Sequence, residues 1–422
     1  MSMESSKKTS LKFPKRFLWG VSSSAHQVDG GSKNQWSEWE KDNALKLAKQ
    51  AEYQFGDLEN WPNIKSQATA AKNYISGTST DHYGNYQKDF DLIKKLNMNA
   101  LRFSIEWSRI EPSEGSWDAR AIDHYRQYVK ELKLRSIEPV VTLFHFTLPV
   151  WFTEMGGFEK RANIKYFVRF AEKIISELGV NVRYIITINE PETYAFESYM
   201  FGNWPPNQAS KWKLWRVVNN LSLAHRQAAK AIHGLNRRYK VSVAKNSTYF
   251  YPGDDAWLTR LSARVMQYVQ DDYFLRKVAR HCDFIGVNYY FTNRVYGYRV
   301  HNPEQDLSDI GWDMQPRDIQ YVLERLHQKY KLPLIVTENG LADAEDKSRK
   351  WWIRETLIGM QAAIDEGVRL DGYLHRSLTD NFEWDKGFWP RFGLFEVDYK
   401  TGARKPRASA VWFSKILKHI RG

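Results

Sequence analysis

Two hydrophobic patterns alternate along the chain of 422 residues. Short apolar runs, of the kind that form strands buried on both faces, are separated by longer segments whose apolar residues recur with the period of a helix. Residues 184–189 form one such run, which carries no charge and is followed by Glu190 and Pro191. Residues 83–96 show the helical spacing. The chain therefore predicts strands and helices in alternation.

The pattern predicts eight strands, at residues 13–24, 99–107, 138–145, 184–189, 241–246, 283–290, 332–340 and 370–375. The intervening helices are predicted at residues 83–96, 121–134, 164–179, 212–233, 258–278, 318–330 and 350–366. Such alternation is typical of a parallel sheet with right-handed crossovers. Eight units favour an α/β fold that is a closed (β/α)8 TIM barrel, with long loops at the carboxyl ends of the strands. An open doubly wound sheet is the alternative, but the first turn lacks the G-x-G-x-x-G fingerprint.

No linker separates the predicted strands, so residues 11–422 are expected to form a single domain. Residues 1–10 are polar and are predicted to be a disordered tail. Residues 32–80 form a polar excursion with a helical middle, residues 39–53. This excursion is too long for an ordinary connection, and we expect a loop that shapes a site.

The charge balance raises the question of a polyanionic partner, because 62 basic and 49 acidic residues give a net charge of +13. The basic residues are scattered without a long run, so we interpret them as a solvated surface and expect no nucleic acid partner. Cys282 is the single cysteine, which excludes an intrachain disulfide and favours a reducing compartment. Residues 1–10 lack the apolar core of a signal peptide, and no apolar run is long enough to span a bilayer. These features predict a cytoplasmic protein with no membrane partner, and they leave the oligomeric state open.

Polar side chains gather where the predicted strands end. They are Arg102, His145, Asn189, Glu190, Asn288, Tyr290, Glu338, Asn339 and the segment 380–384. In a barrel the carboxyl ends of all strands meet on one face, where active sites lie. The sequence therefore predicts a catalytic site on that face.

Glu190 and Glu338 are the paired carboxylates of this set. Two buried carboxylates that face each other hold one proton between them near neutral pH, because repulsion and burial raise one pKa. Glycoside hydrolysis requires one acid to protonate the leaving oxygen and one carboxylate to attack the anomeric carbon. The alternatives are that Glu190 caps a helix in an Asn-Glu-Pro turn, or that each acid is structural, with Arg102 as an ion-pair partner.

Other chemistries find less support in the pattern. His26, His145 and His375 lie on different segments and lack the spacing of zinc ligands, so no metal is expected. His145 could equally be a packed core residue. A serine hydrolase is disfavoured because no G-x-S-x-G is present. The 17 tryptophans offer flat surfaces for sugar rings, although bases and membrane interfaces use the same surfaces.

Several of these segments together resemble a known family. The matching segments are Phe17-Leu-Trp-Gly20 with Gln27 and Gly30, Arg102-Phe-Ser-Ile-Glu-Trp-Ser-Arg109, Thr142-Leu-Phe-His145, Thr187-Ile-Asn-Glu-Pro191, Asp283-Phe-Ile-Gly-Val-Asn-Tyr-Tyr290, Thr337-Glu-Asn-Gly340, Asp380-Asn-Phe-Glu-Trp384 and Arg391-Phe-Gly-Leu394. Over essentially its whole length the chain resembles glycoside hydrolase family 1, the retaining β-glucosidases and β-galactosidases.

The resemblance implies a β-glucosidase-type hydrolase that cleaves terminal non-reducing β-linked glycosides by double displacement, without a cofactor. Its substrate would be a small β-glycoside or an oligosaccharide. In this interpretation Glu338 is the nucleophile and Glu190 is the general acid/base. Asn189 would hold the sugar's 2-hydroxyl, Tyr290 would contact the nucleophile, and Arg102 would keep it ionised. The rest of the glycone subsite would consist of Gln27, His145, Asn288, Glu383 and Trp384, with Glu383 on the 4- and 6-hydroxyls.

The sequence departs from the family pattern at two places. Arg376 stands seven residues before Glu383, where the family has a Trp that stacks on the glycone. We consider three interpretations of Arg376: an impaired or repurposed member that binds a glycan or a protein, an enzyme for an anionic glycone such as a uronic acid, or an introduced substitution. After the acid, Glu192-Thr193-Tyr194 replaces a frequent Trp in a loop that runs to Trp204-Pro-Pro206 and should shape the aglycone side.

The resemblance leaves part of the specificity open. The family's phosphoglycosidases carry a Ser, Lys and Tyr set after the eighth strand that is missing here, so a 6-phosphosugar is not expected. Glucose, galactose, fucose and mannose remain possible glycones, since one hydroxyl-binding set serves all four.

Overall fold

Eight parallel strands close into a barrel in the computed structural model, which describes residues 11–302 and 306–421. The strands are β1 (Leu18–Ser22), β2 (Ala100–Ser104), β3 (Glu138–Phe144), β4 (Tyr184–Asn189), β5 (Lys240–Asn246), β7 (Ile285–Asn288), β10 (Leu334–Asn339) and β11 (Leu370–His375). Their order around the barrel is β1-β11-β10-β7-β5-β4-β3-β2, so β1 and β2 close the ring. The predicted (β/α)8 TIM barrel is confirmed. The predicted tail, residues 1–10, lies outside the described residues.

The barrel interior is filled by one apolar layer to which the strands and their flanks contribute. The layer consists of Leu18, Ala100, Val140, Ile186, Ala244, Phe284, Ile335 and Leu374. Two residues further along three of these strands, the same face carries Arg102, Thr142 and Thr337 instead, all fully buried. Residues two apart on a strand point to the same face, so these polar side chains also face the barrel interior. They form a polar floor for a site above the apolar layer.

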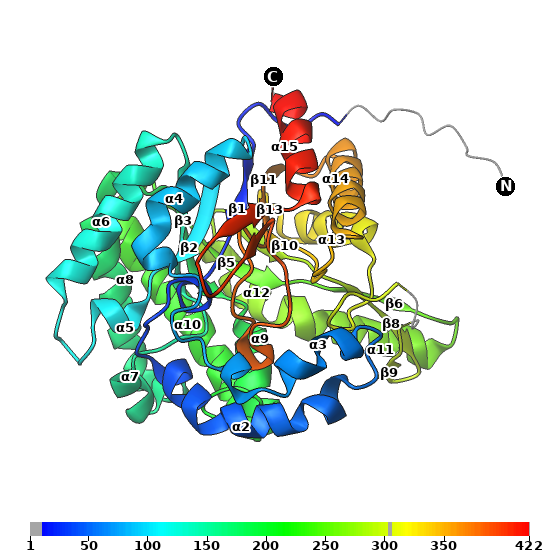
Figure 1. Ribbon diagram of the computed structural model, residues 1–422, viewed down its shortest axis with the longest axis horizontal. Coiled ribbons are helices and arrows are strands. Elements are labelled where there is room, and N and C mark those ends of the chain that lie inside the picture. Colours follow the sequence, from blue (N-terminus) through cyan, green and yellow to red (C-terminus); the bar gives the residue numbers. More distant parts are fainter. Residues whose placement is uncertain (1–10, 303–305, 422) are drawn as a thin grey trace.

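Helices surround the barrel, and Figure 1 shows them outside the strands on every side. The longer barrel helices are α4 (His82–Lys95), α6 (Ala119–Leu134), α8 (Ile164–Leu178), α10 (Lys211–Leu235), α13 (Ile319–Tyr330), α14 (Arg349–Asp365) and α15 (Ala408–Arg421). Shorter helices are α1 (Ala25–Val28), α5 (Trp107–Ile110), α7 (Val150–Glu154), α9 (Pro191–Ala195), α11 (Trp257–Gln267) and α12 (Tyr273–Val278).

Several predicted elements have different ends in the structure, and in two of them a change in local structure accounts for the difference. The predicted strand at residues 99–107 ends at Ser104, because the Glu106 side chain accepts from the backbone N–H of Ser108 and starts α5. The predicted helix at residues 258–278 is divided into α11 and α12 by a π-helical turn, η6 (Tyr268–Asp272). Hydrophobic spacing does not reveal such local changes in hydrogen bonding.

The excursion at residues 32–80 has the helical middle predicted at residues 39–53, but helices also form in the part that was predicted to be a loop. It contains α2 (Gln35–Phe55), α3 (Trp61–Ala68) and a 3₁₀ turn, η1 (Ala71–Tyr74). Asn34 and Ser37 form a capping box that starts α2, and Trp36 and Trp39 are buried against the rest of the fold. Figure 1 shows α2 and α3 on the opposite edge of the molecule from α15.

Short elements outside the barrel were not predicted. They are β6 (Tyr249–Pro252), β8 (Thr292–Tyr296) and β9 (Arg299–Val300) in one small sheet, and β12 (Phe395–Val397) and β13 (Arg404–Pro406) in another. Strands of two to five residues leave little periodic signal. Among the helices of the described part of the chain, none is both long and apolar enough to cross a membrane.

Candidate active site

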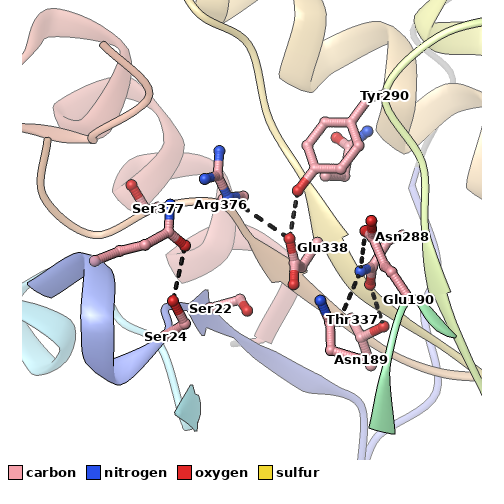
Figure 2. A network of polar contacts seen from close by, with 12 residues as sticks. Ser22, Ser24, Asn189, Glu190, Asn288, Tyr290, Thr337, Glu338, Arg376 and Ser377 are labelled. Carbon is pink, nitrogen blue, oxygen red and sulfur yellow. Dashed lines mark hydrogen bonds and ion pairs between the residues drawn. The ribbon is translucent and has the colours of Figure 1, made fainter. Parts of the chain in front are cut away.

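Glu338 lies near the end of β10 with only 4% of its surface exposed, and three cationic or hydroxyl groups surround it. Arg102 Nη1 donates to its Oε1, and the Tyr290 hydroxyl donates to its Oε2. Arg376 Nε lies 3.6 Å from the same Oε2 (Figure 2). Burial raises the pKa of Glu338, but Arg102, His145, Arg376 and the Tyr290 hydrogen bond together outweigh it and hold that pKa below its ordinary value. Glu338 is therefore an ionised carboxylate at neutral pH.

Arg102 is fully buried on β2, and its hydrogen bonds fix the guanidinium in the barrel floor. Its Nε donates to Thr142 Oγ1 at 3.0 Å, and its Nη1 lies 3.3 Å from Ser22 Oγ. Its Nη2 donates to Asn189 Oδ1 at 2.7 Å. A buried cation held in this way needs a nearby anion, which Glu338 supplies.

Glu190 follows β4 in a left-handed backbone conformation, with φ +40° and ψ +62°. This conformation is uncommon for a residue with a Cβ and marks a backbone constrained by its surroundings. Burial and the charge of Glu338 raise the pKa of Glu190 to about 7, although Asn288 Nδ2 donates to its Oε1 at 2.6 Å. Glu190 therefore keeps a proton under conditions in which Glu338 has lost its own.

Strand pairing is irregular next to both acids. The register shifts between Ile186 and Asn189 on β4, and between Val336 and Glu338 on β10. Irregularities of this kind re-aim side chains and recur beside active sites. They coincide with Asn189 and Glu338, which both contact Arg102 although simple alternation from Ile186 and Ile335 would place them on the other face.

Asparagine side chains connect the two acids. Asn288 Nδ2 also lies 3.1 Å from Asn189 Oδ1, and Asn189 Nδ2 lies 3.1 Å from His145 Nε2. Thr337 Oγ1 donates to Asn288 Oδ1 at 2.7 Å and thereby orients its amide toward Glu190. Figure 2 shows Asn189, Asn288 and Glu190 together on one side of Glu338.

His145 is neutral in this environment. Burial, together with the charges of Arg102 and Arg376, lowers its pKa to about 3, although Glu338 opposes this effect. Within the described part of the chain its buried Nδ1 has no hydrogen-bond partner.

Glu383 and Arg376 stand on the other side of Glu338. Arg376 is 6% exposed, its Nη2 donates to Glu383 Oε2, and its guanidinium carbon lies 4.5 Å from the centre of the Phe392 ring. Gln27 Nε2 donates to the same Glu383 oxygen at 3.2 Å. A Cβ on Gly340 would meet the Arg376 carbonyl oxygen at 1.8 Å, so glycine allows β10 and β11 to approach closely there. Arg376 thus lies between the carboxylates of Glu338 and Glu383.

Trp384 is 5% exposed and packs into an aromatic cluster instead of standing free. Its ring stacks on His145 with centroids 6.0 Å apart and on His26 with centroids 5.7 Å apart. His26 Nε2 lies 2.6 Å from Glu40 Oε1, whereas His375 Nδ1 pairs with the Tyr373 hydroxyl. The structure therefore brings His145 to the acids and leaves His26 and His375 in supporting positions.

Glu192, part of the second departure from the family pattern, is buried and pairs with Lys245 Nζ at 2.5 Å. Burial raises its pKa to about 7, although Lys245 opposes the shift. Tyr194 packs edge-on against Phe144 with centroids 5.1 Å apart. These contacts attach the segment after Glu190 to β5 and β3.

Four neighbours of the site were not predicted: Ser22, Thr142, Thr337 and Phe392. The three hydroxyl residues lie on barrel strands, and a polar residue within an apolar run was the available signal. Phe392 gave no such signal, because only the structure shows that Arg376 stacks on it. No group of three or more metal-ligating side chains occurs in residues 11–302 and 306–421.

The fold and the site together define a class of protein: a TIM barrel with two buried, differently protonated carboxylates at the carboxyl ends of its strands. The comparisons specify this class. The model of the family described as glycosyl hydrolase family 1 matches residues 9–280 and 258–421. The chain belongs to glycosyl hydrolase family 1 and is a glycoside hydrolase.

Three relatives illustrate the similarity. The chain is 28% identical to β-glucosidase A of Thermotoga maritima, over 97% of this chain and 98% of the relative. It is also 28% identical to a β-galactosidase of Sulfolobus acidocaldarius, over 97% and 95%. The solved β-glycosidase of Pyrococcus horikoshii superposes with a TM-score of 0.85 at 33% identity, covering 97% of this chain and 95% of that one.

Proposed function

We propose that the protein is a retaining β-glycosidase that hydrolyses terminal non-reducing β-linked glycosides, with a β-glucoside as its main substrate. The observation that carries the proposal is the opposite displacement of two pKa values: Glu338 lies below its ordinary value, and Glu190 lies at about 7. Double displacement requires an ionised nucleophile and a protonated acid at the same pH. Glu338 and Glu190 have these two protonation states near neutral pH.

In the first step Glu338 attacks the anomeric carbon, and Glu190 gives its proton to the leaving oxygen. In the second step Glu190 takes a proton from water, and the water displaces Glu338. Tyr290 and Arg102 hold the two oxygens of Glu338 and orient the carboxylate for attack. The proposed glycone subsite consists of Asn189, His145, Gln27, Asn288, Glu383 and Trp384.

The first anomer released tests the retaining mechanism. We expect proton NMR to show the β-anomer of glucose first when an aryl β-glucoside is cleaved, with the α-anomer following by mutarotation. Glu338→Gln serves as the control and should lower turnover by at least about a thousandfold, since it removes the nucleophile. Initial release of the α-anomer would contradict double displacement.

A second candidate function is hydrolysis of an anionic β-glycoside such as a glucuronide. The observation that favours it is the ion pair of Arg376 with Glu383, which offsets a negative charge that would repel a sugar carboxylate. The ratio of kcat/KM for p-nitrophenyl β-glucuronide and β-glucoside tests it. A ratio above one supports the anionic glycone, and the absence of glucuronide turnover excludes it.

A further inference from the structure

A groove of about 1010 Å³ lies on the outer wall of the barrel, away from the acids. It is bordered by α10, α12, the 3₁₀ turn η7 (Ala279–His281) and the C-terminal end of α13 with the residues that follow it. Helices α10 and α12 are green in Figure 1. None of the residues that line the groove belongs to the candidate active site.

The lining of the groove contains several cationic residues and no acidic residue. The positively charged side chains are Arg161, Arg226, Arg276, Lys277, Arg280 and Lys329, and we call this surface the cationic groove. No aspartate or glutamate is among its lining residues. Of the six, only Lys329 forms an ion pair within the described part of the chain, with Asp272 Oδ2 at 2.6 Å.

Several other arginines of this protein are neutralised by carboxylates. Arg126 pairs with Asp123 and Glu177, and Arg135 pairs with Asp91 and Glu131. Like charges gathered without counter-charges repel one another, so the cationic groove is an unfavourable arrangement unless an anion occupies it.

Hydrogen-bond donors in the groove also lack acceptors. Within the described residues, the buried Nε of Arg226 has no hydrogen-bond partner. Lys277 Nζ donates to the neutral Asn219 Oδ1 at 2.8 Å and lies 4.3 Å from the centre of the Tyr273 ring, and neither group carries a negative charge. Guanidinium groups present paired N–H donors that match phosphate oxygens in geometry and charge.

We propose that the cationic groove binds a small anion that carries two or more phosphate groups. Five cations without carboxylate partners exceed the charge of a single phosphate and suit a linked pair or more. The volume is that of a small-molecule site, for which about 300–1,000 Å³ is typical. A nucleic acid strand is disfavoured because Tyr330 is the only Phe, Tyr or Trp in the lining, and its hydroxyl donates to Asp272.

Calorimetric titration of the full chain with inorganic pyrophosphate and tripolyphosphate tests the proposal. We expect saturable binding by wild type, weakened at least about tenfold in Arg226→Ala/Arg280→Ala and weakened further by added salt. The exposed single variant Arg280→Glu provides the same test with little risk to folding. Arg264→Ala is the matched control, because Arg264 is exposed on α11 and does not line the groove.

Aryl β-glucoside turnover should be the same in all four proteins, which would show that the barrel is intact. Absence of binding, or equal binding by wild type and Arg280→Glu, would overturn the proposal. Tighter binding of a single-stranded oligonucleotide than of tripolyphosphate would also overturn it, since a polymer would then be the better ligand.

Discussion

Arg376 and Glu383 form a buried ion pair directly beside Glu338. One guanidinium nitrogen donates to Glu383 Oε2, while Nε lies 3.6 Å from Glu338 Oε2. Glu383, Tyr290 and Glu338 together raise the pKa of Arg376 despite its burial, so this cation is permanent. The proposed sugar-binding acid and the proposed nucleophile therefore share a positive charge where the family has an aromatic surface.

Replacing Arg376 by Trp should alter substrate preference. Stacking of a ring on an aromatic surface is worth about 1–3 kcal/mol, so we expect kcat/KM for the neutral β-glucoside to rise about tenfold. The glucuronide should lose rate, because Glu383 would no longer be neutralised. Kinetics on both aryl glycosides measure the two effects. Arg376→Lys retains the charge and is the control, and unchanged rates in Arg376→Trp would show that the position does not govern specificity.

The pH dependence of hydrolysis should follow the two acids. Activity requires protonated Glu190, whose pKa is about 7, so kcat/KM should fall as the pH rises through about 7. The acidic limb should lie below the ordinary glutamate range, because the pKa of Glu338 is lowered. Glu190→Gln should remove the basic limb with an activated aryl leaving group, which needs no protonation. A basic limb that persists in this variant would assign it to another group.

Asn288 offers a finer test of the same assignment. Its Nδ2 donates to Glu190 and stabilises the ionised form, so Asn288→Ala should raise the pKa of Glu190. The basic limb of the pH profile should then move to higher pH while the acidic limb remains in place. Thr337→Val, which removes only the bond that orients Asn288, should produce a smaller shift in the same direction. A shift to lower pH would contradict the assignment.

The two acids should have opposite effects on stability. Burial and the charge of Glu338 raise the pKa of Glu190 from 4.5 to about 7, so keeping it ionised in the folded protein costs on the order of 3 kcal/mol above pH 7. This cost is lost progressively as the pH falls from about 7 toward 4.5, and Glu190→Gln should therefore stabilise the protein at about pH 8 more than at about pH 5.

Glu338 has a lowered pKa and stabilises the fold when ionised. Glu338→Gln leaves the Arg102 charge buried without its partner and should destabilise the fold at about pH 8 by about 3 kcal/mol. Thermal unfolding of both variants at the two pH values measures these effects. Destabilisation by both variants at about pH 8 would show that ionised Glu190 does not lower the stability of the folded protein.

Much of the fold follows from the hydrophobic pattern. Strand β4 has the predicted bounds, because residues 184–189 are an uncharged run and side chains on both faces of the strand are buried. The length of helix α2 was underestimated at its N-terminal end. Its buried Trp36 and Trp39 lie within a polar stretch, and its first residue is set by the Asn34 cap. The π-helical turn at η6 depends on local hydrogen bonds that spacing does not encode.

The sequence predicted which residues form the site better than it predicted how they contact one another. Glu190, Glu338, Asn189, Asn288, Tyr290 and Arg102 are brought together as the strand ends suggested. Arg376 was recognised as unusual, but its pairing with both Glu383 and Glu338 depends on the path of the chain after β11. Trp384 was assigned to the subsite, and its packing against His145 and His26 emerges only in three dimensions.

Covalent trapping tests the central claim most directly. In a 2-deoxy-2-fluoro β-glucoside the fluorine slows both steps, whereas an activated leaving group speeds only the first step, so the glycosyl-enzyme accumulates. We expect mass spectrometry of the digested protein to find the fluorosugar esterified to Glu338, with no label in Glu338→Gln. A label on Glu190 or on another residue, or turnover without any covalent intermediate, would contradict the assignment of Glu338 as the nucleophile.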